Sequence, residues 1–317
     1  MTLANDIKES RNIKDKSLKS YLIALKKIYR VVTEKDDYDS KLFNSANFLK
    51  SKYFKKIMDF LDTLKLPTRK NYIASILVAL TTDKEGNKDI IEQYRNKLDV
   101  IANEYNDQIN SQKKSDKLQT NWTTMAQLKK VIARHKRSIK EKGLDSKTTF
   151  NNSDRDLYQM YLTGSLYTLL PPVRNDYADM KVISFKDYNK LEDKKANYLV
   201  IVGKSKKFFS FGAYKTSDVY GVKIVQVPAT LNKIINKWLE HNKTGYFLIS
   251  KQMKPITDNG LTKLLNKTFS DTDKKIGSTI IRHIYLSEKY GDVNDEKEQD
   301  SYVMGHSVEM ANSYVKK

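Results

Sequence analysis

A polar run at residues 106–121, NDQINSQKKSDKLQTN, constrains the fold of this chain more than any other feature. A segment with so few apolar side chains has little to bury and cannot form part of a hydrophobic core. We therefore expect a linker at 113–121 between two domains, residues 1–112 and 122–317. The chain of 317 residues is long enough for each domain to bury a core of its own.

The N-terminal domain is predicted to be helical. In SLKSYLIALKKIYRVV, with Ser17 as the expected cap, apolar and basic side chains lie on opposite faces of a helix. The apolar face carries Leu18, Leu22, Leu25 and Tyr29, and the basic face carries Lys19, Lys26 and Lys27. A second helix, LPTRKNYIASILVAL, is expected to start after Pro67 with Thr68 as its cap. Basic helix faces of this kind suit a DNA-binding domain, although most surface lysines are simply solvated.

The C-terminal domain is predicted to combine helices with a small sheet. A helix is expected in TTMAQLKKVIARHKRSIKEKG, capped by Thr123 or Thr124 and stopped at Gly143, and another in RDLYQMYLTGSLYTLL. The pattern then alternates in NYLVIVG, KKFFSFGAYKT and GVKIVQVP, which predicts three short antiparallel strands. Helical patterns return from PATLNKIINKWLEH onward. The expected fold class is mainly α with a small antiparallel β-sheet, an α+β arrangement.

The charge of the chain indicates its partner. The formal net charge is +20 and the pI is about 9.6, so the molecule attracts polyanions, and double-stranded DNA is the expected partner. An anionic membrane is the competing partner, but no run approaches the roughly 18 apolar residues of a membrane span, and MTLANDIKES does not resemble a signal sequence. We expect a soluble, intracellular and DNA-associated protein.

Several kinds of chemistry are excluded by residue types and spacing. The chain has no cysteine, which rules out disulfides, thiolate metal sites and cysteine nucleophiles. The four histidines lie too far apart for a recognisable metal-ligand spacing, and neither a glycine-rich phosphate loop nor a G-x-S-x-G motif is present. We expect neither a metal nor a nucleotide cofactor.

What remains is a set of cations and one phenol, in a fixed order along the second domain. The set is Arg174 in LPPVRNDYADMK, Lys215 in YKTSDVYGVKIVQVP, Arg282 in IIRHIY, His306 in MGHS, and Tyr314. This order resembles that of the tyrosine recombinase (phage-type integrase) family from about Trp122 to the end. Within that family the motifs are most similar to those of large DNA viruses, satellite viruses and Crypton-like elements.

The resemblance implies a reaction and a role for each residue. A tyrosine nucleophile, Tyr314, would form a covalent 3′-phosphotyrosine that conserves the bond energy for religation. Arg174 and Arg282 would grip the non-bridging oxygens of the phosphate, because guanidinium groups bind phosphate in pairs and keep their charge. Lys215 would be the general acid for the leaving 5′ oxygen, and His306 would donate a hydrogen bond to the phosphate.

The sequence departs from the family pattern at several positions. Thr279 stands where a His or Lys is usual, three residues before Arg282, and could donate one weaker hydrogen bond. Tyr177 stands where an acidic residue is usual, three after Arg174, with Asp176 one place early. The spacing from His306 to Tyr314 is one residue shorter than the commonest one. Rivals for the lysine role are Lys204, Lys206 and Lys207, and we favour Lys215.

Alternative functions share parts of this pattern. A type IB topoisomerase or a telomere resolvase would use the same site chemistry, and a non-catalytic basic DNA-binding protein would leave these residues scattered. A metal-dependent integrase would need a carboxylate cluster, whereas DTD at 271–273 and DEKEQD at 295–300 suit solvated loops. The family resemblance implies a homotetramer on DNA. The self-repulsion of the +20 charge favours a monomer when the protein is free.

Overall fold

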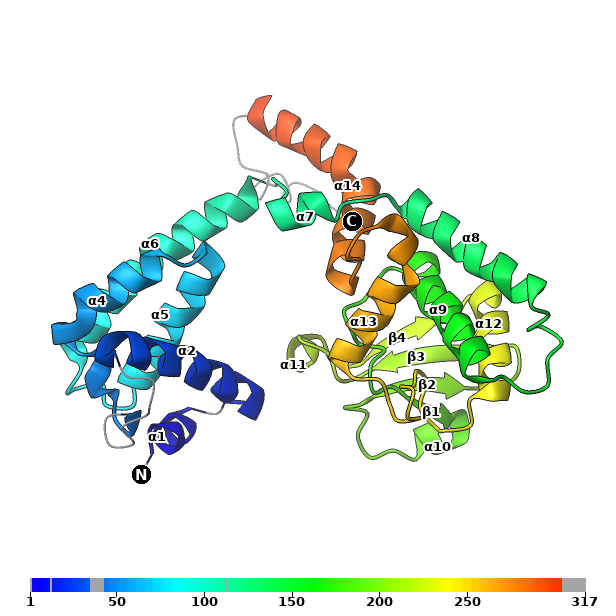
Figure 1. Ribbon diagram of the computed structural model, residues 1–317, viewed down its shortest axis with the longest axis horizontal. Helices are drawn as coiled ribbons and strands as arrows, with labels where there is room; N and C mark the ends of the chain where they lie inside the picture. The colour runs from blue at the N-terminus through cyan, green and yellow to red at the C-terminus, as the bar shows by residue number, and fades with distance from the viewer. Residues whose placement is uncertain (1, 12, 35–42, 112, 304–317) are drawn as a thin grey trace. The chain divides into compact units, whose positions relative to one another are not determined.

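The computed structural model describes residues 2–11, 13–34, 43–111 and 113–303, and the side chains of 294, 297 and 299–303 are not described. The chain is mostly helical with one small sheet, consistent with an α+β fold (Figure 1). It divides into two compact units, Met1–Lys113 and Lys114–Lys317. Each unit has a hydrophobic core of its own.

The first unit is built from helices around a central apolar helix. Its elements are α1 (Leu3–Ser10), α2 (Asp15–Thr33), η1 (Ala46–Leu49), α4 (Ser51–Asp62), α5 (Leu66–Leu80) and α6 (Lys88–Asn110). Helix α5 packs against α2, α4 and α6, and its buried side chains include Ile73 and Ile76. The predicted apolar face of α2 is confirmed at Leu25 and Tyr29, which are fully buried.

Both predicted helix caps in this unit are wrong by two residues or more. Helix α2 begins at Asp15, so Ser17 lies inside its first turn, and α5 begins at Leu66 with Lys65 as N-cap. Pro67 therefore lies in the first turn of α5, where its missing N–H removes no helical hydrogen bond. The polar run at 106–121 is also partly helical. Helix α6 continues to Asn110. The predicted linker at 113–121 contains a short helix, α7 (Asp116–Thr120), which is capped by Ser115.

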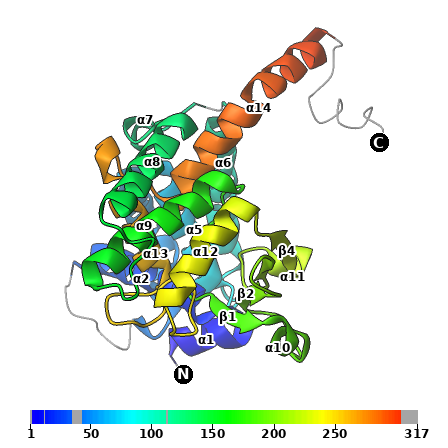
Figure 2. The same cartoon turned by 90° about the vertical axis from the view of Figure 1, so that its right-hand side faces the viewer.

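The second unit packs helices against one four-stranded sheet. Its helices are α7, α8 (Met125–Glu141), α9 (Asn152–Leu169), α10 (Phe185–Asn189), α11 (Ser217–Tyr220), α12 (Ala229–His241), α13 (Asp258–Thr268), η2 (Ser270–Thr272) and α14 (Ser278–Val303). The strands are β1 (Lys181–Ser184), β2 (Asn197–Ile201), β3 (Lys207–Phe211) and β4 (Lys223–Gln226). Thr124 caps α8 and Gly143 follows its end with φ of 60°, as predicted. Figures 1 and 2 show α14 leaving the other helices of this unit after its first turns.

The sheet is mixed, which corrects the prediction of an antiparallel sheet. The three predicted strands exist as β2, β3 and β4, and they pair antiparallel in that order. The fourth strand, β1, pairs with β2 in parallel, with Lys181 opposite Tyr198. Four residues, KVIS, are too short to show an alternating pattern, so only the tertiary pairing identifies β1 as a strand.

Helix α9 lies at the centre of the second unit. It packs against α8, α12 and α13, and Leu162, Leu166 and Tyr167 on it are fully buried. Gly164 permits the close approach of α8, because a Cβ atom there would lie 1.9 Å from Cδ1 of Ile132. The helices α8, α12 and α13 are therefore positioned by their packing on α9.

We expect Gly164→Ala to destabilise the protein even though alanine favours helices. The added methyl would overlap Ile132, and such overpacking costs about 1–3 kcal/mol. The matched control is Gly291→Ala in α14, where a Cβ meets no atom within 4 Å and helix propensity should contribute up to about 1 kcal/mol of stability. Denaturant unfolding of both variants measures the difference. Equal effects of the two substitutions would contradict the close packing of α8 on α9.

Candidate functional site

Arg174 lies in the segment that follows the buried helix α9. Pro171 and Pro172 prevent the helix from continuing past Leu169. The Tyr167 hydroxyl donates a hydrogen bond of 2.7 Å to the backbone oxygen of Arg174. Burial raises the pKa of Tyr167 well above its ordinary value, so this hydroxyl stays protonated as a donor. The backbone of Arg174 is thus fixed to α9 while its side chain is exposed.

Asn175 ties this segment to two further helices. Its Nδ2 donates to the backbone oxygen of Asp258 at 2.9 Å and to Oγ1 of Thr262 at 3.0 Å, both on α13. Its Oδ1 accepts a hydrogen bond of 2.8 Å from the buried Ser278 hydroxyl, at the start of α14. One amide side chain therefore sets the position of Arg174 relative to the first turns of α13 and α14.

Arg282 lies on the second turn of α14, half-buried and close enough to Arg174 for their charges to interact. Burial lowers the pKa of Arg282, and repulsion from the Arg174 guanidinium lowers it further, whereas the Asp176 carboxylate raises it. Burial raises the pKa of Asp176, and the charges of Arg174 and Arg282 oppose that rise. The charges of two guanidinium groups from distant segments thus both act on one partly desolvated carboxylate. An anion placed between them would relieve their repulsion.

Thr279 is exposed on the first turn of α14, three residues before Arg282 and hence on the same face of the helix. The position of α14 is set by its buried Ile281 and Ile284 and by Glu288. The Glu288 carboxylate accepts hydrogen bonds of 3.0 and 3.3 Å from the backbone N–H of Met125, at the start of α8. Glu288 thus caps α8 from a distant part of the chain. Its negative charge also interacts favourably with the positive N-terminal end of the helix dipole.

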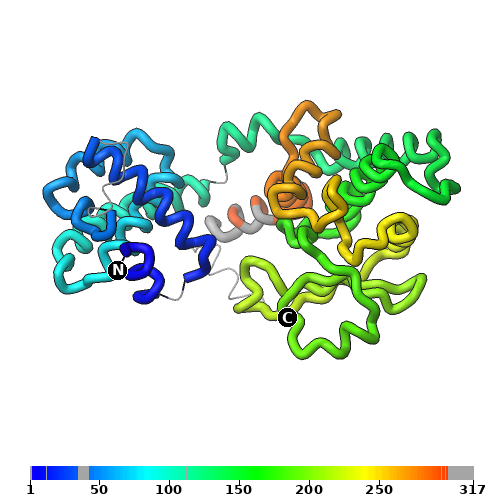
Figure 3. Tube along the Cα trace, turned by 60° about the horizontal axis from the view of Figure 1, so that its bottom comes forward, coloured from blue at the N-terminus to red at the C-terminus, as the bar shows by residue number. Residues whose placement is uncertain are grey.

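Lys215 lies in the connection between β3 and β4, exposed and two residues after Ala213. The chain leaves the sheet at Gly212, where a Cβ atom would lie 1.7 Å from the backbone oxygen of Lys194, so only glycine fits. The strand predicted for KKFFSFGAYKT therefore ends at Phe211 and leaves Lys215 in a loop. Figures 1 and 3 show this loop, with α11, extending away from the strands.

Asn197 joins the Lys215 loop to the segment of Arg174. This buried side chain donates from Nδ2 to the backbone oxygens of Asp176 and Ala213, both at 2.9 Å. Its Oδ1 accepts from the backbone N–H of Ala213, also at 2.9 Å. The two segments are consequently held together at their backbones, through a residue at the start of β2.

The rival lysines differ in their surroundings. Lys207 is only 2% exposed, and it donates to Oδ1 of Asn232 at 2.8 Å and to Oδ1 of Asn236. It holds β3 against α12 and has no access to an external ligand. Lys204 and Lys206 are exposed on the turn between β2 and β3.

The structure therefore brings Arg174 and Arg282 together, with Thr279 one turn away, and ties the loop of Lys215 to the same segment. His306 and Tyr314 lie outside the described residues. Asn175 and Asn197 were not singled out from the sequence, because an asparagine carries no signal until its distant partners are known. Tyr177 is a core residue, 1% exposed and packed on Tyr167, Phe209 and Phe247 by its ring edge or at a tilt. The neighbouring Asp176 supplies the carboxylate at this site.

Comparison of the chain with protein-family models, curated proteins and solved structures finds no match in any of the three. Among the helices of the described segments, none is both long and apolar enough to cross a bilayer. In the same segments, no three His, Asp or Glu side chains are grouped so that they could hold a metal ion.

We expect Asn197→Ala to destabilise the second unit by about 1–3 kcal/mol, because it leaves three backbone groups without their partner. Denaturant unfolding measures the loss. The control is Asn189→Ala at the exposed end of α10, which should change stability by less than about 0.5 kcal/mol. If both variants unfolded at the same denaturant concentration, the hydrogen bonds of Asn197 would not hold the two segments together.

Proposed function

We propose that this protein cuts and rejoins DNA strands as a tyrosine-type recombinase. The first unit would be a helical DNA-binding domain and the second the catalytic domain. The observation that carries the proposal is the pairing of Arg174 with Arg282. These two cations come from segments far apart in the sequence, yet the charge of Arg174 lowers the pKa of Arg282. Two guanidinium groups near enough to influence each other's charge suit a phosphate with two non-bridging oxygens.

The proposed reaction proceeds by attack of the Tyr314 oxygen on a DNA phosphorus atom. A new bond forms between this oxygen and phosphorus, the bond from phosphorus to the 5′ oxygen breaks, and a 3′-phosphotyrosine results. The phenol releases its proton to solvent water as the bond forms, and Lys215 gives a proton to the leaving 5′ oxygen. Arg174 and Arg282 stabilise the added negative charge, with hydrogen bonds from His306 and Thr279. Religation reverses these steps with a 5′ hydroxyl as the nucleophile.

The protein surface supports DNA as the partner. The formal charge of +20 attracts a polyanion at long range, and the proposed chemistry needs neither a metal nor a nucleotide cofactor. Strand exchange between two duplexes needs one active site for every strand that is cut, which implies a homotetramer on DNA. We place the reaction inside the cell, where DNA is available. A topoisomerase or telomere resolvase would use the same site on a single duplex.

We expect the protein to form a covalent adduct with DNA when EDTA is present. A nicked suicide duplex labelled on the 3′-phosphate side, denatured after incubation, would carry the protein on that phosphate. Tyr314→Phe should abolish the adduct while DNA binding survives, because one hydroxyl contributes little to affinity beside many basic groups. Arg174→Ala and Arg282→Ala should each lower the rate of adduct formation by about 100-fold or more.

The matched control is Arg137→Ala, which removes an equal charge from an exposed position on α8. Its rate of adduct formation should stay within about threefold of the wild-type rate, because a single exposed charge contributes little energy. An adduct that persists in Tyr314→Phe would transfer the nucleophile to another tyrosine, with Tyr302 nearest in sequence. Absence of any adduct with wild-type protein on cleavable DNA would overturn the proposal in favour of a non-catalytic DNA-binding protein.

DNA binding should depend strongly on salt. If the protein contacts about six or more phosphates, affinity should fall by on the order of 10³ over a fourfold rise in salt concentration. Fluorescence anisotropy of a labelled duplex across a salt series measures the slope. A slope near zero would mean that the basic surface does not face the phosphate backbone.

A further inference from the structure

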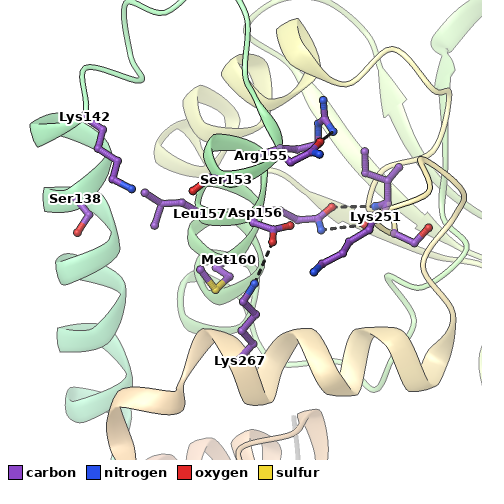
Figure 4. Close-up of a pocket in the computed structure, with 13 residues that line it drawn as sticks. Ser138, Lys142, Ser153, Arg155, Asp156, Leu157, Met160, Lys251 and Lys267 are labelled. Carbon is purple, nitrogen blue, oxygen red and sulfur yellow. Dashed lines mark hydrogen bonds and ion pairs between the residues drawn. The ribbon is translucent and has the colours of Figure 1, made fainter.

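The second unit has a pocket of about 560 Å³ at the opposite end of α9 from Arg174 (Figure 4). Its walls are the end of α8, the first half of α9, residues 249–251 and the last turn of α13. Pockets of about 300–1,000 Å³ are the size that holds small molecules. Helix α9 has 18 residues and is therefore about 27 Å long. A single phosphate cannot contact both ends, so this pocket is separate from the arginine site.

The pocket is strongly basic. Asp156 is the one acidic residue of its lining. Four cationic side chains also line it: Lys142, Arg155, Lys251 and Lys267. Asp156 pairs with Lys267 at 3.1 Å, so three positive charges remain in excess. Figure 4 shows lysines from three different elements extending toward the face of α9 that carries Asp156. Such a concave cluster of one sign attracts and concentrates anions.

The wall that carries Lys251 is rigidly attached to α9. The Gln159 side chain is 6% exposed, and its Nε2 donates to the backbone oxygen of Ile249 at 3.0 Å. Its Oε1 accepts from the backbone N–H of the same residue at 2.9 Å. The Ser250 N–H donates to the backbone oxygen of Lys254 at 2.8 Å, which closes the turn around Lys251. The basic groups are therefore presented by a preformed frame.

Arg155 lines the pocket, and a hydrogen bond orients its guanidinium group. One terminal nitrogen of its guanidinium donates to Oδ1 of Asn152 at 3.0 Å, which orients the group. Its Nε is buried and meets no hydrogen-bond acceptor among the described residues. Because an enclosed Nε cannot be reached from the pocket, only the terminal nitrogens of Arg155 could bind an anion there.

We propose that this pocket binds a phosphorylated small molecule of nucleotide size. Arg155, Lys142 and Lys251 would hold its phosphate groups, and the apolar side chains of Leu157 and Met160 would contact the rest of the ligand. A DNA duplex is much wider than the pocket and cannot enter it, so the recess suits a free ligand better than a duplex backbone. The inference does not depend on the DNA chemistry proposed above.

Titration calorimetry of the full chain with ATP and with inorganic pyrophosphate, at fixed ionic strength and without DNA, tests this proposal. Both probes should bind, and Lys251→Gln and Arg155→Gln should each weaken binding by about tenfold, as expected for a charge-assisted contact. Lys251 is exposed, so its variant should fold normally. The control is Lys254→Gln, which removes an equal charge from the same turn outside the pocket and should leave affinity unchanged.

Failure of both probes to bind wild-type protein at millimolar concentration would overturn the proposal. An equal loss in Lys254→Gln would do the same, because it would reduce the effect to the general field of a basic protein. A duplex titrated in the same way provides the remaining comparison. If Lys251→Gln weakened duplex binding while neither small probe bound, the pocket would be part of a DNA interface and not a small-molecule site.

Discussion

The burial of α9 is the constraint on which the rest of the second unit depends. This helix packs on α8, α12 and α13, and its second half, LTGSLYTL, is apolar or small on nearly every side. Because the helix is packed on several sides, the polar groups at both of its ends are held in fixed positions. Its last turns hold the backbone of Arg174 through Tyr167, and its first turns form the basic pocket around Arg155. A rigid central element allows exposed, charged groups at either end to be held in fixed positions without burying the charges themselves.

At the arginine site, the positive charges of Arg174 and Arg282 repel each other. Arg174 and Arg282 are held near each other by hydrogen bonds and packing that involve their backbones and neighbours, while their charges oppose the arrangement. Asp176 compensates only in part, because it is itself partly desolvated. A site of this kind gives up some stability in the free protein and recovers it when an anion binds.

Much of the secondary structure could be predicted from the sequence, because local patterns carry it. The apolar stripe around Leu25 and Tyr29, the capping threonine before α8 and the alternation in β2, β3 and β4 act over a few residues. The errors arose where the information is not local. The start of α5 moved to Leu66 because proline is tolerated in a first turn, and β1 is too short to show a period. The parallel pairing of β1 with β2 depends on residues seventeen positions away along the chain.

For the candidate site, residue types and the resemblance of their order to a family pattern selected Arg174, Lys215, Arg282, Thr279, His306 and Tyr314, and their roles stay predictions. Only the tertiary structure decided that the charges of Arg174 and Arg282 both act on Asp176, and that Lys207 is enclosed while Lys215 is exposed. It also decided which asparagines join these segments. The physical reason is that a hydrogen bond such as that between Ser278 and Asn175 links residues about a hundred positions apart, and no local pattern encodes such a partner.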